Sequence, residues 1–160
     1  MFPAQPTEDH RWLQQLIGDW TYEGECMMGP DKPSETSRGT ETVSALGDLW
    51  IVGESEGEMP GGGAATMRIT LGFDPAKGRF VGSWVGSMMP MLWTYEGLLD
   101  ADRKVLTLES EGPSFSGDGT LSKYRDIIEI KSPTERLFYS QVLGPDGTWN
   151  QFMTSRYSKR

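Results

Sequence analysis

Turn-forming residues recur along the whole of this sequence, and they limit the fold more than any other feature. Gly, Pro and Asp supply the backbone conformations that tight turns need. The clearest turns are Gly29-Pro30-Asp31, Gly47-Asp48, Asp74-Pro75-Ala76-Lys77-Gly78, Asp100-Ala101-Asp102, Ser132-Pro133-Thr134 and Gly144-Pro145-Asp146-Gly147. Because the segments between these turns are short, the pattern predicts many short strands joined by hairpins.

The strands expected between these turns lie at 19–28, 35–45, 49–56, 65–73, 79–86, 92–99, 104–110, 120–130, 135–143 and 148–157. No second helix long enough to connect parallel strands is predicted, so the sheet should be antiparallel throughout. An open sheet of this width would leave two exposed edges, and closing the sheet removes both. The fold class is therefore all-β, a single antiparallel up-and-down β-barrel of about ten strands.

Side chains in a strand point alternately to its two faces, so the sequence also predicts what lies inside the barrel. In the first strand one face carries Trp20, Tyr22, Gly24, Cys26 and Met28, and the other carries Thr21, Glu23 and Glu25. In later strands the expected inward residues are Met67, Ile69, Leu71, Phe73, Phe80, Gly82, Trp84, Leu106, Leu108, Tyr124, Ile128, Ile130, Leu137, Tyr139, Trp149 and Met153. Both faces of 49–56 and 92–99 carry large apolar groups. Glycines within strands are expected at sharp bends of the barrel, at Gly24, Gly53, Gly72, Gly82 and Gly97.

The segment before the first strand has the spacing of a short helix. Leu13, Leu16 and Ile17 lie at i, i+3 and i+4, which forms one apolar stripe. Either Thr7 or Asp9 can cap the start of this helix. We expect the helix to close one end of the barrel.

Length and composition exclude several classes of protein. With 160 residues the chain is near the commonest domain size, so we expect an extended tail at 1–9 and a single barrel domain at 10–160. The net charge of −8 works against partners such as nucleic acid or an anionic membrane. Cys26 is the only cysteine, so neither an intrachain disulfide nor a cysteine-based zinc site is expected. We expect a cytoplasmic protein, because the start lacks a signal peptide and no apolar run spans a bilayer.

A helix that leads into Gly18-Asp19-Trp20 at the head of the first strand resembles the lipocalin and fatty-acid-binding superfamily. In that superfamily the Trp packs at the closed end of the barrel, beneath a basic side chain from the last strand. The resemblance implies that Trp20 and Arg156 form this pair. It also implies that any ligand enters from the opposite end.

A second resemblance covers nearly the whole chain. The sequence is similar to the uncharacterised bacterial family called domain of unknown function 1579, for which a lipocalin-like, calycin-type barrel is implied. The resemblance brings no catalytic residues. The motifs that carry it are His10-x-x-Leu13-x-x-Leu16-Ile17-Gly18-x-Trp20, Gly72-Phe73-Asp74-Pro75, Phe80-Val81-Gly82-Ser83-Trp84, Tyr95-Glu96-Gly97 and Arg156-Tyr157.

Three features invite a catalytic interpretation. Gly53-Glu54-Ser55-Glu56-Gly57 matches the Gly-x-Ser-x-Gly nucleophile elbow, but no helix-forming segment follows it and the only His lies upstream. His10 is a candidate base or haem ligand, against which we favour a structural, hydrogen-bonding His at the helix start. Carboxylates two residues apart, such as Glu109 and Glu111, are expected on a solvated outer face. Neither a metal site nor a cofactor is predicted.

Met88-Met89-Pro90-Met91-Leu92-Trp93 is the most unusual run in the chain. Methionine is flexible and polarisable, so this run is open to three interpretations: a ligand site at the barrel mouth, a subunit contact, or core packing. The Gly-rich loop 57–64 is interpreted as a lid over the mouth or as a plain hairpin loop. The irregular stretch 112–119 is expected at the same end.

The leading hypothesis is a barrel that binds a small apolar or amphipathic molecule. The rivals are an interaction module, including a homodimer that uses the barrel as a scaffold, and a hydrolase-like enzyme. The candidate ligand-binding residues are Met67, Trp84, Met88, Met91, Trp93, Tyr95, Tyr124, Arg125, Tyr139, Gln141 and Met153, with Arg125 or Gln141 as the polar anchor.

Overall fold

The computed structural model describes residues 4–27, 31–59 and 62–160. The predictions made for Met28, Gly29 and Pro30, and for Gly61, lie outside these ranges. Helix α1 (Glu8–Leu13) continues as a short 3-10 turn (Gln14–Leu16) and leads directly into the first strand. The barrel domain was expected to start at residue 10. The helix begins two residues earlier, at Glu8, because Thr7 caps it.

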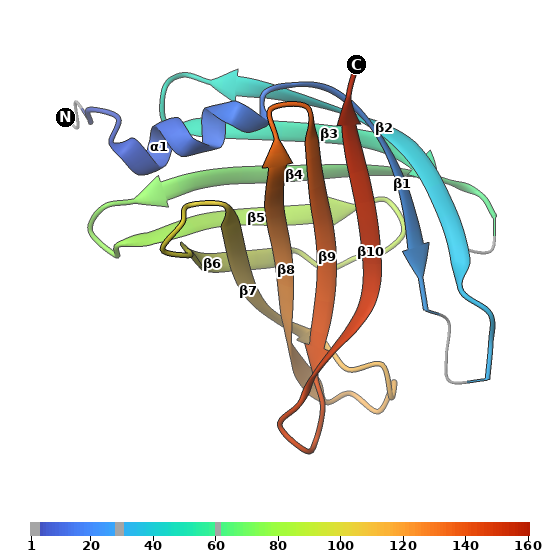
Figure 1. Ribbon diagram of the computed structural model, residues 1–160. Coiled ribbons are helices and arrows are strands. Elements are labelled where there is room, and N and C mark those ends of the chain that lie inside the picture. The colour runs from blue at the N-terminus through green and yellow to red at the C-terminus, as the bar shows by residue number, and fades with distance from the viewer. Residues whose placement is uncertain (1–3, 28–30, 60–61) are drawn as a thin grey trace.

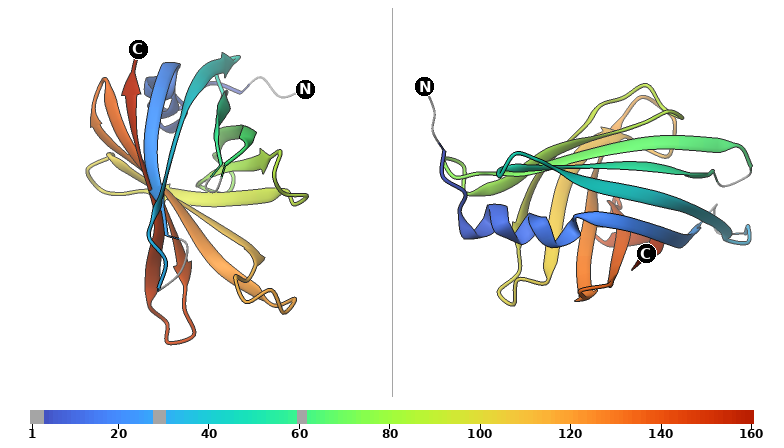
Figure 2. Two further views of the ribbon diagram at one scale, coloured as in Figure 1. Left: turned by 90° about the vertical axis from the view of Figure 1, so that its right-hand side faces the viewer. Right: turned by 90° about the horizontal axis from the view of Figure 1, so that it is seen from above.

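Ten antiparallel strands close into a barrel, which confirms the predicted fold class (Figure 1). Each strand pairs with its neighbours in sequence, and the first strand pairs with the last. The strands are β1 (Gly18–Cys26), β2 (Glu35–Leu46), β3 (Trp50–Glu58), β4 (Ala64–Asp74), β5 (Arg79–Gly86), β6 (Trp93–Leu99), β7 (Val105–Pro113), β8 (Leu121–Ser132), β9 (Glu135–Leu143) and β10 (Trp149–Lys159). Figure 1 and the right-hand view of Figure 2 show that β4 and β5 run across the long direction of β8 to β10.

The helix lies across one end of the barrel and supplies much of the apolar core there. Leu13 and Leu16 are almost fully buried, and they pack with Trp20, Leu71 and Leu106. Burial of apolar surface is the main force that stabilises such a packed layer. The end of the barrel beneath the helix is therefore solid.

The opposite end is formed by the loops that follow the odd-numbered strands. These include the Gly-rich loop between β3 and β4 and the Met-rich run between β5 and β6. Both runs lie at the end away from the helix, as the resemblance to lipocalins implied. Among the described residues, no helix has the length and apolar character needed to span a membrane.

Three predicted inward residues face outward. In β9 the register places Phe138 opposite the inward Ile128, so Leu137 and Tyr139 take the outer face. A β-bulge between Gln151 and Met153 shifts the alternation of β10, which places Trp149 outside. A shift of one residue exchanges the two faces of a strand, and the sequence pattern alone did not reveal the bulge.

Candidate ligand-binding site

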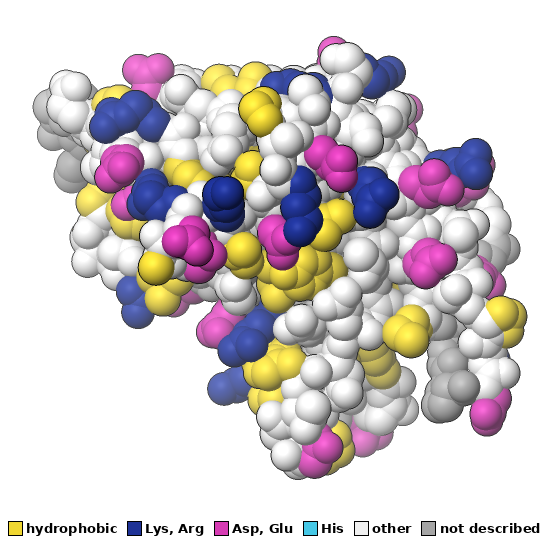
Figure 3. Space-filling view, viewed as in Figure 1, with side chains coloured by type: hydrophobic (Ala, Val, Ile, Leu, Met, Phe, Trp, Pro, Cys, Tyr) yellow, Lys and Arg dark blue, Asp and Glu magenta, His cyan; other side chains and the backbone are white. Residues whose placement is uncertain are grey.

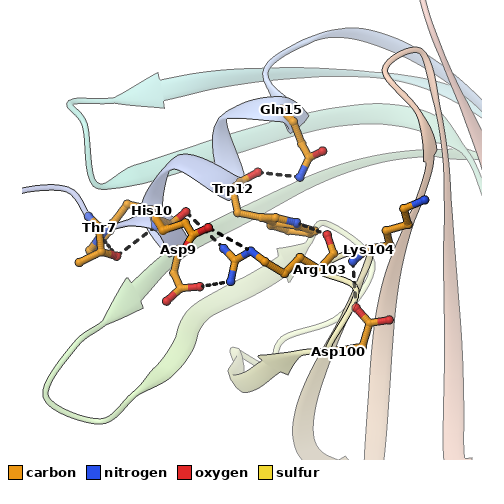
Figure 4. A network of polar contacts seen from close by, with 9 residues as sticks. Thr7, Asp9, His10, Trp12, Gln15, Asp100, Arg103 and Lys104 are labelled. Carbon is orange, nitrogen blue, oxygen red and sulfur yellow. Dashed lines mark hydrogen bonds and ion pairs between the residues drawn. The ribbon is translucent and has the colours of Figure 1, made fainter.

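His10 fixes the helix to the barrel. The backbone N–H of Thr7 donates to His10 Nδ1 at 2.9 Å (Figure 4). His10 Nε2–H donates to the carbonyl oxygen of Phe73 at 2.9 Å. His10 is buried, and both ring nitrogens are occupied. The structure confirms the structural interpretation of this residue.

Arg103, in the turn between β6 and β7, ties that turn to the same helix (Figure 4). Its Nη1 donates to Asp9 Oδ1 at 3.0 Å, and its carbonyl oxygen accepts from Trp12 Nε1 at 2.7 Å. Arg103 has a φ of 56°, the left-handed region that few non-Gly residues adopt. These contacts close the helix end of the barrel.

Arg136 and Lys159 both lie over the Trp20 ring, so the prediction of Arg156 is wrong. Arg136 is the buried one of the two. The Arg136 guanidinium carbon lies 4.6 Å from the Trp20 ring centroid and 4.0 Å from that of Tyr157. Arg156 lies opposite Glu23 on the outer face, its side chain is 69% exposed, and it pairs with Glu135. Because neighbouring residues of β10 alternate between faces, Tyr157 points inward and Arg156 outward.

A buried ion pair lies beside this stack. Arg136 Nη2 donates to Glu41 Oε1, and both side chains are less than 10% exposed. Ser55 Oγ donates to the other oxygen of Glu41 at 3.1 Å. Gly53 leaves room for the carboxylate, because a Cβ there would lie 2.8 Å from Glu41 Oε2. Ser55 sits within a regular strand, so this segment is not a nucleophile elbow.

A second polar cluster lies further along the lumen. Tyr95 Oη donates to Asp126 Oδ2, and Ser140 Oγ donates to Asp126 Oδ1 at 2.6 Å. Burial raises the pKa of Asp126, against the two hydroxyl donors that lower it. Burial and the neighbouring Asp126 raise the pKa of Tyr95 well above its ordinary value. The cluster therefore places an acid and a phenol, both hydrogen-bonded, within the barrel.

Partly buried side chains form the inner wall around these clusters. Met67, Trp84, Phe138, Met153 and Tyr157 point inward, and each is partly rather than fully buried. Beyond the closed end, the inner face of the barrel is therefore largely aromatic and thioether in character.

Aromatic residues gather at the open end. Trp93 and Tyr124 pack edge to face with ring centroids 5.2 Å apart, and Phe152 lies 6.2 Å from Tyr124. Trp93 Nε1 points to Met89 Sδ at 3.1 Å, which ties the Met-rich run to the rim. Met88 and Met91 lie in this run and are half-buried.

A groove of about 700 Å³ also opens at this rim, between the start of β2 and the loop that joins β3 to β4. Its walls include Met59, Gly62 and Gly63 of the loop proposed as a lid. Glu35 lines it as well, and its Oε2 is buried without a hydrogen-bond partner among the described residues.

Three of the candidate ligand-binding residues lie outside the lumen, which corrects the prediction for them. Arg125 stacks on Trp149, 3.9 Å from the ring centroid. Tyr139 donates to Glu129, and Gln141 donates to Gln151. All three share the outer face of β8 and β9, because Arg125 is paired with Gln141 and Ile127 with Tyr139. For the remaining eight candidates, the strand register or the position in the chain agrees with a place in the lumen or at its mouth. They are Met67, Trp84, Met88, Met91, Trp93, Tyr95, Tyr124 and Met153.

Several polar residues inside the barrel were not predicted, among them Glu41, Asp126, Arg136 and Ser140. A signal for them existed in the alternation. Asp126 lies two residues from Ile128, which is inward, and a charge in phase with an apolar face is unusual in a strand. A search for charged residues that alternate in phase with the inward apolar residues would have identified Asp126.

The carboxylates on the outer face are exposed, as expected. Glu54 pairs with Arg68 at 2.8 Å on this surface, and acidic and basic side chains are interspersed on the face shown in Figure 3. In the described ranges, no group of three or more metal-ligating side chains is found.

Comparison with solved structures finds the same type of barrel in proteins of distant sequence. Rv2717c from M. tuberculosis is 12% identical with a TM-score of 0.67, covering 98% of this chain and 99% of that one. EF1p2_mFAP2b bound to DFHBI is 15% identical with a TM-score of 0.52, covering 96% and 100%. A de novo designed fluorescence-activating β-barrel is 13% identical with a TM-score of 0.51, covering 96% and 100%.

These distant likenesses show the fold alone, whereas the family comparison shows to which family the chain belongs. No curated protein matches the sequence. The family described as protein of unknown function DUF1579 matches residues 5–159, nearly the entire chain. The chain belongs to the DUF1579 family.

Proposed function

We propose that this protein binds a small amphipathic molecule in the lumen of its barrel. The observation that carries the proposal is the inward wall of Met67, Trp84, Phe138 and Met153, which are only partly buried. Ligand sites are usually concave and apolar, with a few polar groups that fix the orientation of the ligand. Asp126 and Ser140 supply such polar groups within this wall.

Two further observations support the proposal. The helix closes one end, so a ligand would enter between the loops at the other end, where Trp93 and Tyr124 lie. A barrel of similar fold, EF1p2_mFAP2b, is known bound to the small molecule DFHBI. A barrel of this general type can therefore hold a dye-sized ligand.

The test uses Nile red, a neutral dye whose fluorescence rises in an apolar site. Met153→Trp adds bulk to the lumen, and the matched control Thr154→Trp adds a Trp on the outer face of the same strand. We expect the wild-type protein and Thr154→Trp to bind Nile red with similar affinity. Met153→Trp should bind at least about tenfold more weakly.

Circular dichroism and thermal unfolding establish that both variants are folded. Equal binding by folded Met153→Trp and the wild type would place the dye outside the lumen and overturn the proposal. Native mass spectrometry of protein purified from its own cells then gives the mass of any bound natural ligand.

Exposed apolar residues at the open rim favour a second candidate function, self-association. Met27, Leu92, Phe115 and Leu121 are each more than 60% exposed, and all four lie at the end away from the helix. Large exposed apolar patches commonly mark interaction sites. Sedimentation velocity tests this candidate: a protein that stays monomeric at millimolar concentration does not use the rim for self-association.

A further inference from the structure

The interior of the barrel carries more negative than positive charge. In the described strands, the charged side chains that face inward are Glu35, Glu41, Asp126 and Arg136. Lys159 shares the inward alternation, but it is exposed at the closed end, over Trp20. Of the inward charged side chains of these strands, Arg136 is therefore the basic one that lies between the two ends of the barrel.

Arg136 already forms an ion pair with another acid, Glu41. Its Nη2 donates to Glu41, and its guanidinium plane lies between the rings of Trp20 and Tyr157. The partners of Asp126 are instead two neutral hydroxyls, those of Tyr95 and Ser140. Among the described residues, Asp126 has no basic partner.

A carboxylate without a counter-ion is costly in a low-dielectric interior. Two hydroxyl donors reduce this cost but leave the charge uncompensated. Each carboxylate oxygen can accept more than one hydrogen bond, so acceptor positions on Asp126 stay available beside those two donors. Asp126 points into the barrel, because the residue is paired with the inward Leu108 and Ser140.

Aromatic rings surround the same space. Tyr95 contacts Asp126 directly, and Tyr157 lies close enough for the Asp126 charge to act on its phenol. Trp84 lines the lumen nearby on β5. A carboxylate combined with aromatic faces is a favourable environment for an alkylammonium group, which ring quadrupoles attract.

We propose that the lumen binds the protonated amino group of an amphipathic amine, with Asp126 as its counter-ion and the aromatic wall against its apolar body. This proposal rests on the proposed function and names its ligand class. It also agrees with the net charge of −8, which raises the local concentration of cations around the protein.

The test compares three probes that share one aromatic body and differ in charge: 2-naphthylethylamine, 2-naphthylethanol and 2-naphthylacetate. Isothermal titration calorimetry at pH 7 measures the affinity of each for the wild-type protein. We expect the amine to bind about tenfold or more tightly than the alcohol, because hydrogen bonds to charged groups contribute more than neutral ones. The acetate should bind most weakly.

Two variants assign the effect to Asp126. Asp126→Asn keeps the shape of the side chain and removes its charge, so it should bring the affinity of the amine close to that of the alcohol. Glu56→Gln is the matched control, since it removes one carboxylate from the exposed outer face of β3. It should leave the preference for the amine unchanged.

The outcomes separate the two proposals. If the alcohol binds as tightly as the amine, or if Asp126→Asn keeps the preference, the amine proposal is wrong while lumen binding stands. If Met153→Trp fails to weaken Nile red binding, the proposed function fails first. Retained Nile red binding by Asp126→Asn shows that this variant is folded and that its lumen is intact.

Discussion

Arg136 lies over Trp20, with its guanidinium carbon 4.6 Å from the ring centroid, and it is joined to Glu41 by a buried ion pair. The stack connects β9 with β1 and β2, which lie about a hundred residues earlier in the sequence. It forms the floor of the lumen and the upper surface of the closed end. The effect of substitutions in this stack on the free energy of unfolding can therefore be measured separately from their effect on ligand binding.

Arg136→Ala should lower the free energy of unfolding by about 3 to 5 kcal/mol, because it leaves Glu41 buried without a counter-ion. Arg156→Ala, the control on the neighbouring strand, should change it by less than about 0.5 kcal/mol, since Arg156 is exposed. Urea unfolding followed by tryptophan fluorescence measures both. Equal losses for the two variants would contradict the assignment of Arg136 as the residue over Trp20.

Replacing both members of the pair should be less damaging than replacing one. In Arg136→Met with Glu41→Gln, no buried charge is left unpaired, and well-packed neutral replacements of buried pairs are often tolerated. We expect the double variant to be more stable than either single one. A loss equal to the sum of the two single losses would show that the pair is not coupled.

Asp126→Asn should stabilise the protein more at neutral pH than in acid. Burial raises the pKa of Asp126 in the folded state, so at a pH between the unfolded and folded pKa values the folded protein holds a proton that the unfolded chain has released. The free energy of unfolding of the wild type therefore falls as pH rises through the interval between the unfolded and folded pKa values. The side chains that face Asp126 and can ionise, Tyr95 and Tyr157, both have raised pKa values and stay neutral there.

Urea midpoints of wild type and Asp126→Asn, measured from pH 3 to pH 7, test this prediction. The difference between them should grow with pH and should be smallest below the ordinary pKa of an Asp. A difference that does not depend on pH would mean that the Asp126 carboxyl titrates normally.

His10→Ala should lower the free energy of unfolding by about 2 kcal/mol. The change removes the half of the capping box in which His10 Nδ1 accepts from the Thr7 backbone N–H, and it leaves the Phe73 carbonyl without the His10 donor. Arg11→Ala alters the exposed neighbour and should cost less than about 0.5 kcal/mol. Hydrogen exchange should show that α1 opens in His10→Ala while the strands stay protected; unchanged protection of α1 would show that His10 does not hold the helix.

The candidate site was predicted only in part, and particular residues show why. Met67, Trp84 and Met153 were assigned to the lumen because each lies in phase with apolar neighbours. Tyr139 and Gln141 were misplaced because both faces of β9 carry large groups, and only the register against β8 chooses between them. Asp126 was missed because its inward position is recognised only when charged residues, and not apolar residues alone, are included in the alternation of the strand.

Local chemistry determined the strands, their turns and the capped helix, because period-two alternation and turn residues act over a few neighbours along the chain. The sequence by itself therefore predicted an antiparallel barrel closed by a short helix. The tertiary structure alone decided which basic side chain covers Trp20, since Arg136 and Arg156 lie in adjacent, paired strands and both are available in sequence. The register of β9 and β10 turns Arg136 inward and Arg156 outward, and such long-range pairing is not encoded in any local pattern.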